Sequence, residues 1–475
     1  MVIDSLQKRD GTSVSLANVN ILVGPNNVGK TQTLQDIRSI MTQPQRNQGL
    51  IFESIAFSSF DSFEQLTQTL SVREDTQRSR YIVSGTDRNA TVSFDDWDSW
   101  KASFSSSQTD NVMNQIAPAK FSFLDAASRL QIGSSQEIEG GRQNPQSTIE
   151  SLFYGSRENL EILRKIFART FEEDIVLDYS EGGTLRFKIS DNFSQIPEHP
   201  MDLGEYLDNI GAEKLDDQGD GFLSFVGVIT SILVSEGRLI LLDEPAAFLH
   251  PPQARILGNW IADRAESTPG QIVIATHNSD FLFGILEEAS EVNIFRLNRP
   301  DKSTIFRSVP PRITKKLAED HLLSSQRVLR SVFHEGVVVC EGGKDRVVYQ
   351  SAASSKDDQT DLLFIDALGW KIIKRVTKSL NGAEIPVAAI ADLDVLSERD
   401  EFKKLLLSLK TELVYDDIED IIEARDTVAQ EVSENGNWDD IKAEGIQAFP
   451  ADAQKEAALI VEAVEQYGLF LVAHV

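Results

Sequence analysis

Residues 24–31, GPNNVGKT, decide how the first part of the chain folds. Residues 13–23, before them, predict a short strand, a turn and a buried strand. Residues 31–41, after them, carry apolar side chains at helical spacing. A strand, a glycine-rich loop and a helix in this order are the context that a phosphate-binding P-loop requires. The sequence therefore predicts a nucleotide site where this helix begins.

The parts of this loop have distinct predicted roles toward ATP. Backbone N–H groups of the loop and of the helix N-terminus would surround the phosphates. Lys30 would reach the β- and γ-phosphates, and Thr31 would ligate Mg²⁺. The residues predicted to bind the nucleotide are Gly24, Asn26, Asn27, Val28, Gly29, Lys30 and Thr31.

Two later strands end in residues that suit the same ATP site. The apolar run LILL is followed by Asp243, which suits the Mg²⁺ shell, and by Glu244, which would position or deprotonate the attacking water. The next apolar run, IVIAT, is followed by His277, whose imidazole would touch the γ-phosphate. Downstream of a P-loop, this order predicts Glu244 and His277 as catalytic residues.

The strings GPNNVGKT, LLDEPAAFLHPPQ and ATHNSDFL resemble those of the ABC-type ATPases, specifically the SMC/RecF-like and OLD-family branch. The DEP-x-x-x-LHP pattern of residues 243–251 is a fairly specific mark of that branch. The resemblance covers about residues 1–330. It implies that two heads sandwich ATP, and therefore at least a homodimer.

The same resemblance implies a signature loop that faces the nucleotide of the other subunit. The best candidate is QGDGFLS, residues 218–224, with Gly219, Asp220 and Gly221 at the nucleotide. Asp220 stands where the family normally has a serine. The N–H dipoles of the following helix would still point at the phosphate. An ordinary turn is the alternative interpretation of these residues.

A second group of acidic residues lies near the C-terminal end of the chain. The run VVVCEGGKD ends a buried strand in Glu341 and reaches Asp345 at a helix start. The run IADLDVL ends another strand in Asp392 and Asp394, and alternation along an extended strand puts both on one side. The ends of parallel strands meet at one sheet edge, where four carboxylates would repel one another without a cation. The sequence therefore predicts a Mg²⁺ or Mn²⁺ site for phosphodiester chemistry.

The order E-x-x-x-D followed by D-x-D resembles the Toprim domain of topoisomerases, primases and OLD-family nucleases, over about residues 335–475. Gly369 matches that family's mid-domain turn. The resemblance implies Glu341, Asp345, Asp392 and Asp394 as metal ligands, with the first, third and fourth also catalytic. Because family members usually continue beyond the last strand, we expect this site to lack some completing residues.

These predictions combine into an α/β protein with two domains. Residues 1–330 would form an ABC-type ATPase head with a helical and irregular insertion at about residues 43–200. Residues 331–475 would form a Toprim-like domain. Within the insertion, residues 149–171 predict one amphipathic helix, and residues 174–190 predict a strand pair.

Composition limits the partners and the compartment. The net charge of −28 argues against a nucleic-acid binder that uses its whole surface, although a local basic channel remains open. Two clusters of basic residues could form such a channel, and the alternative is that they are solvated helix faces. The first cluster is Arg307, Arg312, Lys315, Lys316, Arg327 and Arg330, and the second is Lys371, Lys374, Arg375 and Lys378.

The chain has one cysteine, Cys340, which we expect in the core. With no apolar run near the roughly 20 residues of a membrane span and no signal peptide, we expect a cytoplasmic protein without a membrane partner.

The leading hypothesis is an ATPase head that gates a metal-dependent nuclease in prokaryotic anti-phage defence or DNA processing. The alternative is an ATP-dependent sensor or scaffold that binds a protein partner and cuts nothing. A third hypothesis, a transporter ATPase subunit, fits less well because of the LHP string and the Toprim-like segment.

Overall fold

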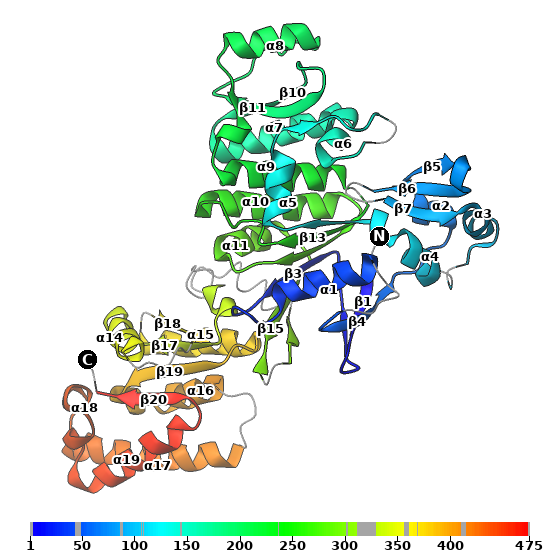
Figure 1. Cartoon of the computed structure of the whole chain (residues 1–475). Coiled ribbons are helices and arrows are strands. Elements are labelled where there is room, and N and C mark those ends of the chain that lie inside the picture. Colours follow the sequence, from blue (N-terminus) through cyan, green and yellow to red (C-terminus); the bar gives the residue numbers. More distant parts are fainter. Residues whose placement is uncertain are drawn as a thin grey trace. The chain divides into compact units, whose positions relative to one another are not determined.

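The computed structural model divides the chain into two compact units (Figure 1). Unit 1 consists of Met1–Val23 and Asn27–Phe306, and unit 2 of Gly24–Asn26 and Arg307–Val475. The residues that the structure describes are 3–42, 49–85, 89–105, 107, 109–142, 145–235, 237–300, 303–310, 329–355, 361–367, 369–409 and 415–473. Within them, no helix is both long and apolar enough to cross a membrane.

A six-stranded sheet forms the centre of unit 1. Its strands, in spatial order, are β16 (Ile305–Val309), β15 (Asn293–Asn298), β3 (Val19–Val23), β14 (Gln271–Ala275), β13 (Leu239–Asp243) and β8 (Phe121–Leu124). The five strands from β15 to β8 run parallel. Their carboxyl ends therefore share one edge, which brings together the residues that follow β3, β13 and β14. The strands predicted before Gly24, Asp243 and His277 are confirmed as β3, β13 and β14.

Helices of unit 1 pack on this sheet and on one another. They are α1 (Lys30–Thr42), α5 (Ala126–Gly133), α9 (Asp220–Val234), α10 (Pro251–Ser267) and α11 (Ser279–Glu288). Helix α1 packs against β13 and β14. Helix α9 is buried without interruption from Leu223 to Leu233, as its apolar sequence on all sides requires. In the α10–α11 pair, a Cβ on Gly284 would lie 2.2 Å from the carbonyl oxygen of Arg255, so the backbones touch.

Part of the expected insertion belongs to the core of unit 1. Strand β4 (Phe52–Phe57) pairs with β1 (Ile3–Lys8), and β8 is an edge strand of the central sheet. Further small elements cover this side of the unit: β2 (Ser13–Ser15), α2 (Phe63–Thr67), β5 (Ser71–Asp75), β6 (Arg80–Ser84), β7 (Asn89–Ser93), α3 (Phe94–Ser103) and α4 (Thr109–Ile116). Their apolar side chains join the core of β3 and α1.

The single helix predicted for residues 149–171 is wrong. The segment forms α6 (Thr148–Tyr154) and α7 (Arg157–Phe171). The helix is interrupted at Ser156, because the side chain of this residue accepts a hydrogen bond from the N–H of Glu158, at 3.1 Å, and caps the start of α7. The predicted strand pair is confirmed as β10 (Asp174–Asp178) and β11 (Thr184–Ser190). The smaller elements beside them are β9 (Gln136–Glu137), α8 (Pro200–Asn209) and β12 (Glu213–Lys214).

Unit 2 contains a four-stranded parallel sheet. In spatial order its strands are β18 (Leu362–Asp366), β17 (Gly336–Cys340), β19 (Val387–Asp392) and β20 (Leu469–Val472). Its helices are α14 (Gly343–Ser354), α15 (Trp370–Gly382), α16 (Arg399–Leu409), α17 (Tyr415–Asn435), α18 (Trp438–Glu444) and α19 (Ala451–Glu465). Strands and helices follow one another along the chain, as the predicted α/β class requires, and the strands again end at one edge.

Candidate functional site

The loop between β3 and α1 has the backbone that its glycines predict. Gly24, Asn27 and Gly29 have φ angles of 137°, 63° and 107°, all in the left-handed region. At Gly29 a Cβ would also lie 2.9 Å from Oγ1 of Thr304, so only glycine fits. The same hydroxyl donates to the carbonyl oxygen of Val28 at 2.9 Å. Lys30 is buried at the start of α1.

The structure brings Thr31 and Asp243 together from positions far apart in the sequence. Oγ1 of Thr31 donates to Oδ1 of Asp243 at 3.0 Å. Burial raises the pKa of Asp243, and the neighbouring charge of Glu244 adds to the rise. A hydroxyl and a carboxylate side by side are hard oxygen ligands, so the donor set fits Mg²⁺.

Glu244 and His277 form a pair at the ends of β13 and β14. Nδ1 of His277 lies 2.7 Å from Oε1 of Glu244, and the backbone N–H of His277 donates to Oε2 at 3.1 Å. The hydrogen bond with Glu244 raises the pKa of His277 against a smaller effect of burial. Glu244 has a φ of 51°, an uncommon value for a residue with a side chain. His277 therefore holds both oxygens of the Glu244 carboxylate.

Gly219, Asp220 and Gly221 lie where α9 begins. Gly219 is the N-cap residue, and α9 starts at Asp220. A Cβ on Gly221 would lie 2.8 Å from the carbonyl oxygen of Phe248, so this turn approaches the segment after β13 closely. Their contact with the nucleotide of a second subunit stays a prediction.

Sequence reasoning missed Arg129. This residue of α5 is completely buried, and its guanidinium donates to the carbonyl oxygens of Asp243 and Glu244 at 2.5 and 2.9 Å. In the sequence it follows DAAS at the start of a short helix and looks like a surface arginine. Only its pairing in space shows that it belongs to the nucleotide site.

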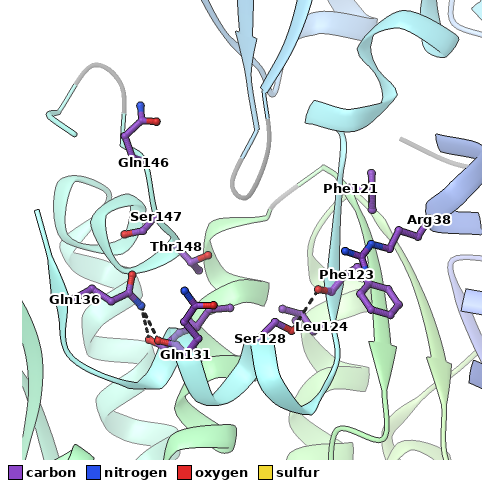
Figure 2. Close-up of a pocket in the computed structure, with 11 residues that line it drawn as sticks. Arg38, Phe121, Phe123, Leu124, Ser128, Gln131, Gln136, Gln146, Ser147 and Thr148 are labelled. Atoms are coloured by element: carbon purple, nitrogen blue, oxygen red, sulfur yellow. Dashed lines mark hydrogen bonds between the residues drawn. The ribbon is translucent and has the colours of Figure 1, made fainter. Parts of the chain in front are cut away.

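A cavity of about 290 Å³ lies beside the edge strand β8 (Figure 2). Polar and apolar side chains from α1, β8, α5, β9 and the start of α6 line it. The guanidinium of Arg38 lies 4.7 Å from the centre of the Phe123 ring, a cation–π contact. None of the residues predicted from the sequence lines this cavity.

In unit 2, three of the four predicted carboxylates converge. Glu341, Asp392 and Asp394 each offer an oxygen, and these atoms lie within 4.8 Å of one another. Burial and the charge of Asp392 raise the pKa of Glu341. Oδ1 of Asp394 is buried and has no hydrogen-bond partner among the described residues. Hard carboxylate oxygens with spare acceptor capacity fit a divalent cation.

Two details of this site differ from the prediction. Asp394 is not on an extended strand, because β19 ends at Asp392 and a 3₁₀-helix at Leu393–Ser397 carries Asp394 back toward the group. Asp345 is not in the group of three. Its Oδ2 accepts from the N–H of Gly342 at 2.9 Å, so it caps the start of α14.

Sequence reasoning also missed Lys442, on α18. Its Nζ lies 2.9 Å from Oδ2 of Asp394, 3.0 Å from Oδ2 of Asp392 and 3.8 Å from Oε1 of Glu341. Burial opposes the charge of Lys442, but the hydrogen bonds to Asp394 and Asp392 outweigh it and raise the pKa. No local pattern marks this lysine, which lies in an acidic stretch of the sequence.

The structure describes the second basic cluster and only part of the first. Lys371 forms an ion pair with Glu398 at 2.9 Å, and Lys374 pairs with Glu401, which favours a solvated helix face for the second cluster. In the first cluster, Arg312, Lys315, Lys316 and Arg327 lie outside the described residues.

Cys340 is buried as expected, and burial raises its pKa to about 12.

A family profile described as "AAA domain, putative AbiEii toxin, Type IV TA system" matches residues 19–283, more than half of the chain. The chain belongs to this family. The match covers β3, the P-loop, β13 and β14, so this AAA domain is an ATP-binding ATPase domain. The carboxylates of unit 2 lie beyond the matched residues.

Other comparisons concern the fold. No curated protein matches the chain. Among solved structures, the SMC head domain from Thermotoga maritima is 12% identical, with 65% of this chain and 100% of that chain covered at a TM-score of 0.34. An SMC head from Pyrococcus furiosus, bound to the C-terminal domain of ScpA, is 10% identical, with coverages of 67% and 98% and a TM-score of 0.36. An ATP-binding cassette of an ABC transporter, in its ADP conformation, is 12% identical, with coverages of 69% and 96% and a TM-score of 0.28. At these TM-scores the likenesses add nothing about function.

Proposed function

We propose that the chain is an ABC/SMC-type ATPase head fused to a metal-dependent, Toprim-like nuclease, as in the OLD family. The observation that carries the proposal is the convergence of Glu341, Asp392 and Asp394 at the edge of a parallel sheet, in a chain that also has a P-loop ATPase domain. In this proposal ATP binding gates cleavage of a nucleic acid.

In the ATPase half, Lys30 binds the β- and γ-phosphates, and Thr31 and Asp243 hold Mg²⁺. When bound, Mg²⁺ neutralises phosphate charge. Glu244 orients the attacking water or takes its proton, and His277, held by Glu244 at 2.7 Å, detects the γ-phosphate. The turn of Gly219, Asp220 and Gly221 faces the nucleotide of a second subunit, which makes a homodimer the smallest functional assembly.

In the nuclease half, Glu341, Asp392 and Asp394 hold Mg²⁺ or Mn²⁺. Such ions stabilise charge on the attacking and leaving oxygens of a phosphodiester. The Asp345 carboxylate fixes the turn after β17 through the N–H of Gly342, and its role as a metal ligand stays a prediction. Lys442 balances the charge of the three acids.

The setting we propose is the prokaryotic cytoplasm, in anti-phage defence or DNA processing. The family's description names a putative toxin of a type IV TA system, which agrees with a defence role. Whether the substrate is DNA or RNA is decided by the assay below.

The proposal is tested by incubating the purified protein with plasmid DNA and with tRNA, in Mg²⁺ or Mn²⁺ and ATP, while ATP hydrolysis is followed in parallel. We expect cleavage of one substrate. Asp392→Ala should abolish cleavage and leave ATP hydrolysis unchanged. The control is Asp452→Asn, which removes an exposed acid in the first turn of α19. Normal cleavage by Asp392→Ala would disprove the nuclease assignment.

One observation favours a second function, an ATP-dependent sensor or scaffold. The ammonium of Lys442 lies within 3.0 Å of Asp392 and Asp394, so the acids have a partner without metal. Such a protein would bind a protein partner through ATP-dependent dimerisation. Cleavage of neither substrate, together with intact ATP hydrolysis, would support it.

A further inference from the structure

Arg129 is a cation in a place where a charge is costly. Its side chain is among the largest that are completely buried in the described part of the chain. Burial lowers its pKa, against the raising effect of nearby Asp243, Asp125 and Glu244. A buried guanidinium is stable only when its N–H groups are satisfied. The acceptors that satisfy it therefore show what this arginine holds in place.

The acceptors come from three different elements of unit 1. The guanidinium donates to the carbonyl oxygens of Asp243 and Glu244, where β13 ends, and to that of Leu124 at 3.2 Å, at the end of β8. Its Nε donates to Oγ of Ser224, on the second turn of α9, at 3.0 Å. One side chain thus ties the start of α9 to the turn that carries the hydrolytic carboxylate.

The turn that Arg129 holds has a strained backbone. Glu244 has a φ of 51°, and residues with a Cβ adopt this region only when their surroundings hold them there. Its N–H donates to the carbonyl oxygen of Ala275 at 2.8 Å, and its own carbonyl oxygen accepts from Arg129. The peptide groups before and after the Cα of Glu244 are therefore both held, and this fixes the direction of its carboxylate toward His277.

Helices α5 and α9 are joined by direct backbone contact. A Cβ on Gly227 would lie 2.2 Å from the carbonyl oxygen of Arg129, and one on Gly133 would lie 2.4 Å from that of Leu223. Close packing of this kind transmits a displacement of one helix to the other. Because α9 begins at the Gly219–Gly221 turn, a contact made at that turn would reach Arg129.

We infer that Arg129 is a positioning residue that holds Glu244 in its hydrolytic conformation and couples the start of α9 to it. The inference rests on the proposed ATPase function and adds a route by which nucleotide-dependent dimerisation controls hydrolysis. Within the described part of the chain, the Arg129 side chain donates only to backbone carbonyl oxygens and to the hydroxyl of Ser224, so it acts through the backbone of Asp243 and Glu244.

The test compares three variants of the full chain with the wild type. Arg129→Lys keeps the charge and loses the forked donors. Ser224→Ala removes the link to α9 and keeps the arginine. The control Ser231→Ala removes a buried hydroxyl on the same helix that has no hydrogen-bond partner among the described residues. Two quantities are measured: kcat and KM for MgATP, and hydrogen exchange of the peptide spanning residues 239–249.

We expect Arg129→Lys to lower kcat by about 100-fold while KM for ATP changes by less than about threefold. Ser224→Ala should lower kcat by about tenfold. Both should speed exchange in residues 239–249, and Ser231→Ala should change neither quantity. A purely structural role would instead lower folded yield and leave kcat per folded molecule unchanged.

Wild-type kcat and unchanged exchange in both Arg129→Lys and Ser224→Ala would overturn the inference. A loss of ATP affinity as large as the loss of turnover would also overturn it, because Arg129 would then support binding. If the wild type itself hydrolyses no ATP, the proposed function fails. The exchange of residues 239–249 then still decides whether Arg129 holds the turn.

Discussion

The nucleotide site of unit 1 and the carboxylate site of unit 2 both lie at the carboxyl edge of a parallel sheet, but they are held in different ways. In unit 1 the carboxylate of Glu244 is fixed by backbone hydrogen bonds to Arg129 and Ala275. In unit 2 the three carboxylates gather around the ammonium of Lys442. The geometry of the nucleotide site is therefore set by the backbone. The geometry of the carboxylate site depends on which cation balances the three acids.

The largest expected effect is a loss of MgATP binding in unit 1 that leaves metal binding in unit 2 unchanged. Lys30→Ala removes the ammonium predicted to bind the phosphates, so affinity for MgATP should fall by about 100-fold or more. Mn²⁺ binding by unit 2 should not change. Calorimetric titration with ATP and with Mn²⁺ measures both, with Lys378→Ala on α15 as the control. Equal ATP affinity in the wild type and Lys30→Ala would refute the P-loop assignment.

Lys442→Met tests the idea that the second site depends on its cation. Without the ammonium, three carboxylates lie together uncompensated, and the free energy of unfolding in EDTA should fall by about 3 kcal/mol. Mn²⁺ should restore more stability to this variant than to the wild type, as measured by thermal unfolding. Lys403→Met, which removes a partner of Glu419, should cost less than about 1 kcal/mol with or without metal. The idea fails if the loss in Lys442→Met is the same in EDTA and in Mn²⁺.

The smallest expected effect is a pH dependence of the first site. The hydrogen bond to Glu244 raises the pKa of His277. A raised histidine pKa adds stability that is fully present below the unfolded value of about 6.5 and is lost as pH rises through the folded value. Glu244→Gln should therefore lower the pKa of His277 in an NMR titration, with the resonance assigned through His277→Gln. A pKa at or below the ordinary value in the wild type would contradict the observed pairing.

Much of the fold was predictable because its signals are local. The P-loop, the apolar runs before Asp243 and His277, and the alternation of strands and helices after Gly336 each depend on neighbouring residues. The break between α6 and α7 also has a local cause, the capping by Ser156, but the apolar spacing of residues 149–171 continues across it. Strand β8 was missed because four residues, FSFL, carry too little periodicity.

The parts that could not be predicted depend on contacts across the sequence. Arg129 and Lys442 are ordinary basic residues in short helices until the fold brings them to carbonyl or carboxylate oxygens. The convergence of Asp392 and Asp394 was predicted, but for the wrong geometric reason, since a 3₁₀ turn follows Asp392. Asp345 has the right spacing for a ligand, and its sequence gives no sign that its carboxylate also accepts the N–H of Gly342.

The central claim, that unit 2 is a metal centre in a P-loop ATPase, is tested most directly by crystals of the full chain soaked in Mn²⁺. Anomalous diffraction locates the ion without reference to activity. We predict anomalous density among the oxygens of Glu341, Asp392 and Asp394, with Nζ of Lys442 withdrawn from the two aspartates. Absence of density there at saturating Mn²⁺, with Lys442 still hydrogen-bonded to Asp392 and Asp394, would contradict the claim.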